Sequence, residues 1–314
     1  MTTPALEVVA PAGTLAALRA AVEAGADAVY CGFRDATNAR NFPGLNFSRD
    51  DLREGIAFAH GRGVRVFLAI NTFPAATAPA LWRQAVDDAA RLGVDALILA
   101  DIGLLDYAST RHPDVRRHLS VQASAATAEA ITYYAEAFGV RRVVLPRVLA
   151  IPEITILTNA VTVETEVFAY GGLCVMAEGR CHLSSYVTGQ SPNTHSVCSP
   201  ASHVRYEQRA GRLVSRLGAF TINTFAPEES AGYPTLCKGR FKTRDRTGYL
   251  FEEPVSLNVI DLLPALKAAG VRAIKIEGRQ RVGGPMWPRS RQPSATPWMP
   301  RPQGTPAGRT RWRT

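Results

Sequence analysis

The amino-acid sequence predicts an α/β protein with a (β/α)8, TIM-barrel-like fold. Between Leu6 and Gly278 the chain repeats one pattern, a helix-like stretch followed by a glycine and a short run rich in β-branched residues. Glycine fits the left-handed position that ends a helix, and an apolar run suits a strand covered on both faces. Eight such runs alternate with helical segments, which is typical of a barrel of parallel strands.

Four copies of this pattern have their glycine at Gly25, Gly93, Gly139 and Gly270. The stretch before the second glycine, residues 79–92, has apolar residues spaced near 3.6, as an amphipathic helix requires. The eight expected strands are Val8–Ala10, Ala28–Cys31, Val66–Ile70, Ala96–Ala100, Leu119–Gln122, Val143–Pro146, Glu166–Tyr170 and Ala273–Ile276. A doubly wound open sheet is the alternative, because periodicity does not separate the two. Against it, Pro11-Ala12-Gly13 after the first strand is a turn and not a G-x-G-x-x-G motif.

Composition narrows the class of protein. The 314 residues are 46% hydrophobic, enough for a large core, and no run of eighteen apolar residues predicts a membrane span. The first residues show no basic segment before an apolar stretch, so no signal peptide is expected. Clustered cysteines without an export signal predict a cytoplasmic location, where thiols stay reduced.

The net charge of +9 comes mostly from the last 34 residues. Residues 281–314 contain seven Arg, seven Pro and no acidic residue, which leaves 29 basic and 27 acidic residues in the rest of the chain. Residues 1–280 are therefore close to neutral, and their charge gives no support for an RNA partner. We expect residues 281–314 to be a disordered, non-native tail, because its composition is that of a GC-rich gene read out of frame; a basic arm is the alternative. Residues 1–280 are expected to form the barrel domain, and this domain includes a cysteine segment, residues 171–240, after the seventh strand.

Polar residues stand where several expected strands end. The carboxyl ends of barrel strands build the active site, so these residues should surround a bound substrate. Lys275 and Glu277 are two residues apart and share one face of their strand, although they could simply pair with each other. The polar loop Arg34–Phe47 either contributes to this site or only covers it. The strand-end residues are Asn71, Asp101, Gln122, Arg147, Lys275 and Glu277.

Four of the five cysteines lie within one stretch, from Cys174 to Cys237, separated by six, sixteen and thirty-eight residues. Such a cluster is typical of a four-thiolate metal site. The spacing alone does not choose between an iron–sulfur cluster and a zinc ion bound by four cysteines. The fifth, Cys31, falls within a strand and is expected to be a small buried apolar residue.

A specific motif surrounds the first two cysteines. Residues 166–174 read EVFAYGGLC, and Gly179-Arg180-Cys181 follows with Ser184 shortly after. This segment resembles the signature of the collagenase-like peptidase family. Only Gly172 departs, where the family usually has Ser or Ala. Within the family the chain is most similar to the UbiU branch of ubiquinone biosynthesis. That resemblance covers residues 6–280 and includes Thr37–Arg40, Ser120–Ser124, Gly189–Thr194, Ala231–Arg240 and Lys275–Arg279.

The resemblance implies an iron–sulfur protein that hydroxylates ubiquinone precursors without molecular oxygen, in a heterodimer with a sister protein, UbiV. Relatives that hydroxylate tRNA and rRNA take the oxygen atom from prephenate, and the same donor is implied here. The ligands of a [4Fe-4S] cluster then correspond to Cys174, Cys181, Cys198 and Cys237. Four thiolates would occupy all four irons, which favours electron transfer over Lewis-acid chemistry.

On this basis we expect five strand-end residues to form the catalytic site and hold an acidic donor such as prephenate, namely Lys275, Glu277, Arg147, Gln122 and Asn71. An iron–sulfur RNA hydroxylase of the same family is the main alternative. Proteolysis has little support, since the sequence contains neither H-E-x-x-H nor G-x-S-x-G.

Overall fold

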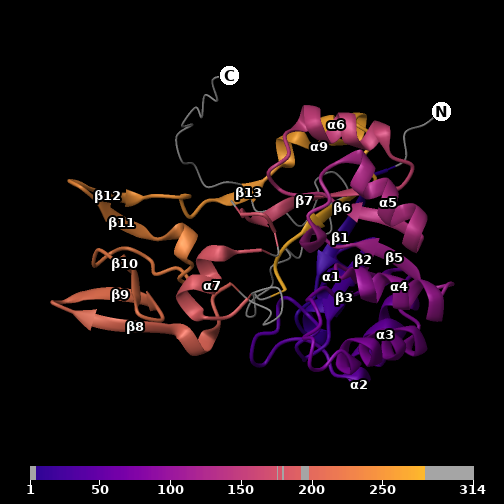
Figure 1. The fold of residues 1–314 in the computed structure, drawn as a ribbon, viewed down its shortest axis with the longest axis horizontal. Coiled ribbons are helices and arrows are strands. Elements are labelled where there is room, and N and C mark those ends of the chain that lie inside the picture. Colours follow the sequence, from indigo (N-terminus) through magenta and orange to yellow (C-terminus); the bar gives the residue numbers. More distant parts are fainter. Residues whose placement is uncertain (1–4, 175, 179, 192–197, 280–314) are drawn as a thin grey trace.

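The computed structural model describes residues 5–174, 176–178, 180–191 and 198–279. Eight parallel strands form a closed barrel (Figure 1), with β14 hydrogen-bonded between β7 and β1 and with β6 paired to β7. The predicted barrel is therefore confirmed, and the open doubly wound sheet is wrong. The barrel strands are β1 Glu7–Pro11, β2 Ala28–Gly32, β3 Arg65–Ile70, β4 Ala96–Leu99, β5 Arg116–Leu119, β6 Val140–Val144, β7 Glu164–Gly172 and β14 Ala273–Ile276.

Helices connect successive strands and cover the outside of the barrel. Local signals fix their ends: Ser48 and Asp51 form a capping box at the start of α2, and Gly93 ends α3 with a φ of 79°. The other three glycines of the repeated pattern also have positive φ values. The helices are α1 Leu15–Glu23, α2 Arg49–His60, α3 Ala80–Leu92, α4 Ile102–Arg111, α5 Ala128–Phe138, α6 Ile151–Ala160 and α9 Leu263–Ala268. None of the described helices is long and apolar enough to cross a membrane.

The interior of the barrel is apolar in one layer and charged in another. Phe67 and Ile98 belong to the inner apolar cluster. Arg142 of β6 is 0% exposed and lies 2.6 Å from a carboxylate oxygen of Glu7 and 3.1 Å from one of Glu166. Burial of these charges is possible because each one is paired.

Two strands begin three residues earlier than predicted. The run Leu119–Gln122 was expected to be the fifth strand, but β5 ends at Leu119 and a 3-10 turn, η1, spans Val121–Ala123. The sixth strand was expected at Val143–Pro146, and β6 begins at Val140. The reason is the charged layer inside the barrel. Charged side chains at the start of these strands face the interior, so each strand begins before the apolar run that marks it in the sequence.

A long insertion between β7 and α9 forms a separate small lobe beside the barrel (Figure 1). Its three-stranded and two-stranded antiparallel sheets were not predicted. Ala210-Gly211, with positive φ at both residues, is the hairpin signal that could have found them. The elements are α7 His182–Thr188, η2 Ala201–His203, β8 Val204–Arg209, β9 Arg212–Leu217, β10 Phe220–Thr224, η3 Leu236–Lys238, β11 Arg240–Thr243 and β12 Arg246–Tyr249.

The chain returns from this lobe to the barrel through β13, Ser256–Asn258, which pairs antiparallel with β7, and η4, Ile260–Leu262. The expected cysteine segment, residues 171–240, thus includes the end of a barrel strand and most of the lobe. The predicted tail, residues 281–314, lies outside the described residues.

Candidate functional site

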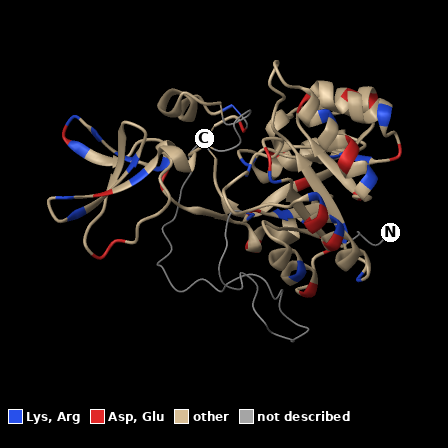
Figure 2. Ribbon diagram, turned by 90° about the horizontal axis from the view of Figure 1, so that it is seen from below, with Lys and Arg blue, Asp and Glu red and all other residues tan. Residues whose placement is uncertain are grey.

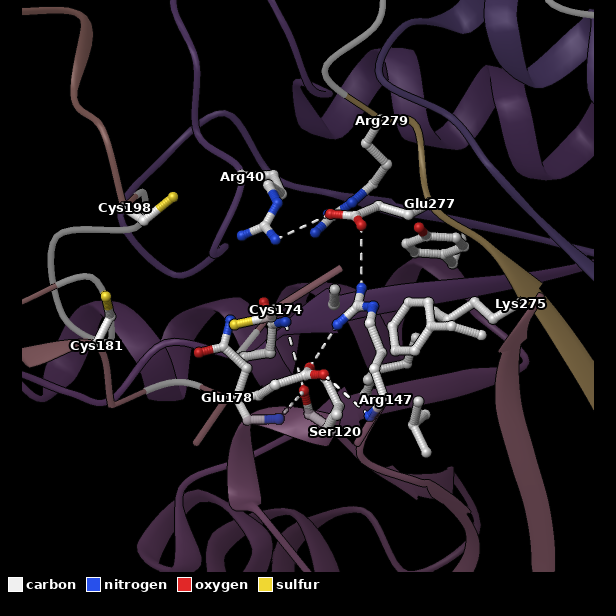
Figure 3. Close-up of a pocket in the computed structure, with 18 of the residues that line it drawn as sticks. Arg40, Ser120, Arg147, Cys174, Glu178, Cys181, Cys198, Lys275, Glu277 and Arg279 are labelled. Atoms are coloured by element: carbon white, nitrogen blue, oxygen red, sulfur yellow. Dashed lines mark hydrogen bonds and ion pairs between the residues drawn. The ribbon is translucent and has the colours of Figure 1, made fainter. Parts of the chain in front are cut away.

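A cavity of about 140 Å³ opens at the carboxyl ends of the barrel strands (Figure 3). Its apolar wall includes Ile98, Val144 and Phe168. The structure brings all five residues predicted to be catalytic to this cavity, together with three of the four clustered cysteines: Asn71, Gln122, Arg147, Lys275, Glu277, Cys174, Cys181 and Cys198. The sixth strand-end residue, Asp101, does not line the cavity, because its side chain caps the start of α4 and accepts from the backbone N–H of Leu104 at 2.9 Å. The barrel mouth and the cysteine segment therefore border one space.

Arg147, just after β6, connects three parts of the site. Its guanidinium lies 2.6 Å from Glu178 and 3.1 Å from Glu277, and it stacks 3.4 Å from the ring centre of Phe168. Burial lowers the pKa of Arg147, but the two carboxylates outweigh burial and raise it. Arg147 is thus a fixed cation that joins the cysteine segment to the end of β14.

Glu277 is held as a carboxylate. It accepts hydrogen bonds from Arg40 at 3.1 Å, from Arg147 at 3.1 Å and from the backbone N–H of Gly172 at 3.0 Å. Burial raises its pKa, but Arg147 and Arg40 outweigh burial and lower the pKa to about 2. Glu277 therefore orients neighbouring cations and does not supply a proton at neutral pH.

Lys275 points into the barrel from β14. Its Nζ donates to Glu166 at 2.7 Å and lies 3.9 Å from the ring centre of Tyr30. Burial lowers the pKa of Lys275 against the opposing effect of Glu166. The alternative that Lys275 and Glu277 only pair with each other is wrong, because each has other partners.

The two predicted amide residues differ in how fully they are bonded. The Oδ1 of Asn71 accepts from the backbone N–H of Ala39 at 3.0 Å, so Asn71 anchors the polar loop. Gln122 lies on η1, and its buried Oε1 has no hydrogen-bond partner in the described part of the chain. An unpartnered buried acceptor at a cavity is suited to a donor on a ligand.

The polar loop Arg34–Phe47 contributes to the site. Asn38 donates to Phe33 O at 2.9 Å and accepts from the backbone N–H of Arg40 at 2.9 Å. This arrangement directs Arg40 into the cavity, where it meets Glu277. Sequence reasoning named this loop but did not choose between a functional and a covering role.

Several lining residues were not predicted as site residues. Glu178 has a signal in its position between Cys174 and Cys181, and Arg279 ends the Lys275–Arg279 segment of the resemblance. Tyr30 and Phe168 lie within strands and look like ordinary core residues.

The four clustered thiols influence one another. Burial raises the pKa of Cys237 to about 11, and the thiolates of Cys198, Cys174 and Cys181 add to that rise. Cys181 is the N-cap of α7 and accepts from the backbone N–H of Ser184 at 3.4 Å. Cys237 lies on η3, which packs against α7.

Cys31 is separate from these four residues. It is fully buried in β2, and burial raises its pKa to about 12. Its predicted role as a small buried core residue agrees with this position.

The donor set fits a cluster of several metal atoms. All four candidate ligands are thiols, the donors that iron–sulfur clusters require. Among the described residues, no three His, Cys, Asp or Glu side chains converge where one metal ion could bind. A four-iron cluster is larger than a single ion, and each thiolate would bind a different iron, so the four thiols would surround the cluster and not meet at one point.

A family-wide sequence profile, described as "Peptidase family U32", matches residues 13–284. The chain belongs to the peptidase U32 family. It is 31% identical over 294 residues to "tRNA hydroxylation protein P" of Escherichia coli, covering 88% of this chain and 64% of that protein. The U32 family thus includes proteins whose names refer to hydroxylation.

Two further U32 relatives show how varied these names are. The "23S rRNA 5-hydroxycytidine C2501 synthase" of Escherichia coli is 31% identical, over 88% of this chain and 37% of its own length. The "Collagenase" of Porphyromonas gingivalis is 29% identical, over 88% and 61%. The chain therefore spans less than two thirds of the length of these curated relatives.

Proposed function

We propose that this U32 protein takes part in oxygen-independent hydroxylation of ubiquinone precursors, with prephenate as the oxygen donor and a UbiV-like protein as its partner. The observation that carries the proposal is the shared cavity, where strand-end cations meet three of the four clustered cysteines. Relatives named for tRNA and rRNA hydroxylation support the reaction class.

In this proposal Cys174, Cys181, Cys198 and Cys237 hold one [4Fe-4S] cluster, which supplies electron transfer when bound. One ion pair of the chain would hold the cluster ligands next to the cavity. Glu178 lies between two of the cysteines and pairs with Arg147, so the cysteine segment keeps its position against the barrel.

The choice of a quinone precursor rests on the resemblance to UbiU, and the size of the cavity sets only how large its occupant can be. A space of about 140 Å³ is close to the engineered cavity of roughly 150 Å³ that binds benzene. A single substituted ring is therefore a suitable occupant. Replacing a C–H bond of the precursor by C–OH removes two electrons, which prephenate does not take up because its hydroxyl oxygen is already at the oxidation level of water. A UbiV-like partner with its own cluster would pass these electrons on to an external one-electron acceptor.

The test is an anaerobic assay with purified protein, a UbiV-like partner, a ubiquinone precursor, prephenate labelled with ¹⁸O and a redox dye as electron acceptor. Mass spectrometry should show a hydroxylated product that carries the label and depends on both proteins. Cys174→Ala should abolish the product, and Cys31→Ala should not. A labelled product without the partner would refute the heterodimer, and no product under any condition would refute the quinone assignment.

RNA hydroxylation is the second candidate, and the charge of the lobe favours it. Residues 204–249 contain nine Lys or Arg and four Asp or Glu, and basic residues lie on both hairpins of the lobe (Figure 2). Tyr206 is 45% exposed on the same lobe. Basic side chains beside exposed aromatic rings are typical of a surface that binds single-stranded nucleic acid.

The two candidates predict different results for variants of the lobe. Lys242→Glu combined with Arg246→Glu changes two exposed cations far from the cavity. If RNA is the substrate, this variant should lose binding to total tRNA and lose hydroxylated nucleosides. If a quinone precursor is the substrate, product formation from that precursor should stay unchanged.

A further inference from the structure

One of the cations that line the cavity differs from the others in its partners. Four cationic side chains line it, and three of them have the carboxylate partners described above. The fourth, Arg279, has no ion-pair partner within the part of the chain that the structure describes. Arg40 and Arg147 moreover share one carboxylate, that of Glu277. The four cations are Arg40, Arg147, Lys275 and Arg279.

Arg279 is nevertheless buried. It is 6% exposed, and its Nη1 donates to Asn38 Oδ1 at 2.9 Å. Its guanidinium carbon lies 5.2 Å from the ring centre of Tyr30. Burial is the main cause that lowers the pKa of Arg279, and the nearby charge of Arg40 lowers it further. Glu277, which forms no ion pair with Arg279, opposes this lowering only in part. A buried guanidinium without a counter-ion is unfavourable, so an anion beside it would gain energy.

Two glycines make room for Arg279. A Cβ atom on Gly32, at the end of β2, would lie 2.8 Å from the Nη1 of Arg279 and 2.5 Å from the Cγ of Asn38. A Cβ atom on Gly13 would lie 1.9 Å from the carbonyl oxygen of Arg279. The ends of β1 and β2 therefore admit this arginine only because they carry no side chains there.

The remaining donors of Arg279 define the chemistry of a ligand. A guanidinium has five N–H donors, and the hydrogen bond to Asn38 uses one of them. Planar guanidinium groups bind carboxylates through two parallel hydrogen bonds. Figure 3 places Arg279 and Arg40 on the same side of the cavity, across from the labelled Ser120 and Glu178.

We propose that Arg279 is the anion-binding residue of this cavity, and that its ligand is a small carboxylate with a body of about one ring. The carboxylate would lie against Arg279, and the ring would lie against the apolar wall formed by Ile98, Val144 and Phe168. The assignment deepens the proposed function, because it names the residue that would hold the acidic donor. It differs from the expectation that Lys275 and Arg147 do so, since both already face carboxylates.

The test measures binding and not hydroxylation, so that the proposed function can fail separately. Anaerobically purified full-length protein is dialysed to equilibrium against radiolabelled benzoate and, in parallel, against benzamide, its neutral counterpart of similar shape. The wild type should bind benzoate in preference to benzamide. Arg279→Gln keeps a hydrogen-bond donor for Asn38 but removes the charge, and it should weaken benzoate binding about tenfold or more while leaving benzamide unchanged.

Arg53→Gln is the matched control, because Arg53 is an exposed arginine on α2, outside the cavity and outside the polar loop. It should not change either affinity. Arg279→Lys keeps the positive charge but loses the two parallel N–H donors, so it should give an intermediate benzoate affinity. It replaces Arg279→Gln as the test if that variant does not fold. Unchanged benzoate affinity in the folded variants, or an equal loss for benzamide, would overturn the assignment. Benzoate binding without prephenate-dependent hydroxylation would overturn only the proposed function.

Discussion

Arg147 and Glu178 form a buried ion pair, with Nη1 of the arginine 2.6 Å from Oε2 of the glutamate. Their side chains are 6% and 7% exposed. Arg147 follows a barrel strand, whereas Glu178 lies between Cys174 and Cys181 in the sequence. This pair therefore sets the distance between the barrel mouth and the first two candidate cluster ligands.

Glu178→Gln should weaken the fold and loosen the cysteine segment. Removing one partner of a buried pair typically costs about 3–5 kcal/mol, and we expect the lower end because Arg147 keeps Glu277. Urea unfolding measures the loss, and iron content should also fall. Glu207→Gln is the control, because its partner Arg209 is 57% exposed and such surface pairs contribute about 0–1 kcal/mol. Equal losses for the two variants would contradict the role given to Arg147 and Glu178.

The four clustered cysteines should each be required for iron. We expect about four irons and four sulfides per chain in protein purified without oxygen. Replacing any one of Cys174, Cys181, Cys198 or Cys237 with Ala should remove most of both. Cys31→Ala is the control and should keep the metal, because Cys31 is a buried core residue. Stoichiometric zinc in place of iron would show that the cluster assignment is wrong.

Neighbouring glycines at the end of β7 should respond differently to the same change. A Cβ on Gly171, which has a φ of 137°, would lie 2.5 Å from the Cβ of Glu277. Strain and overpacking together should make Gly171→Ala cost about 2–4 kcal/mol in urea unfolding. A Cβ on Gly172 would lie 3.4 Å from Glu277 Oε2, so Gly172→Ala should cost less than about 1 kcal/mol. Similar costs for both would refute this explanation of the sequence.

The contribution of Glu277 to stability should depend on pH in one direction. Its pKa is about 2 in the folded protein against an ordinary value of 4.5. A lowered carboxylate pKa stabilises the fold above the ordinary value, on the order of 3 kcal/mol here, and this contribution is lost as pH falls toward the folded pKa. The advantage of the wild type over Glu277→Gln should therefore be constant above pH 4.5 and shrink between pH 4.5 and 2.

Urea unfolding at several pH values across that window measures the difference. Asp50→Asn, which changes an exposed carboxylate, controls for the general loss of a negative charge. An advantage of the wild type that grows on acidification would contradict the assigned cause.

Much of the barrel was predictable because its signals are local. The repeated glycines occupy left-handed positions that few other residues adopt, and they mark the ends of helices in the sequence itself. The polar residues after the strands reach one cavity because parallel strands end at the same rim.

The rest depends on contacts between distant parts of the chain. The charged side chain of Arg142 in β6 can be buried because Glu7 and Glu166 pair with it inside the barrel. Nothing in the sequence near residue 142 indicates those partners. That Arg279 has no ion-pair partner among the described residues likewise follows only from where the carboxylates of the site lie. The hairpins of the lobe carry few apolar residues, so the pattern of alternation was weak there.

The placement of β14 between β7 and β1 determines when the molecule can finish folding. Glu7 pairs with Ala273, so the first strand of the chain has to wait for the last one. During synthesis, β1 and β7 would each present an unpaired edge while the whole lobe is being made. Open strand edges of this kind invite pairing with other chains. The nascent protein should therefore depend on chaperones until residue 276 has left the ribosome.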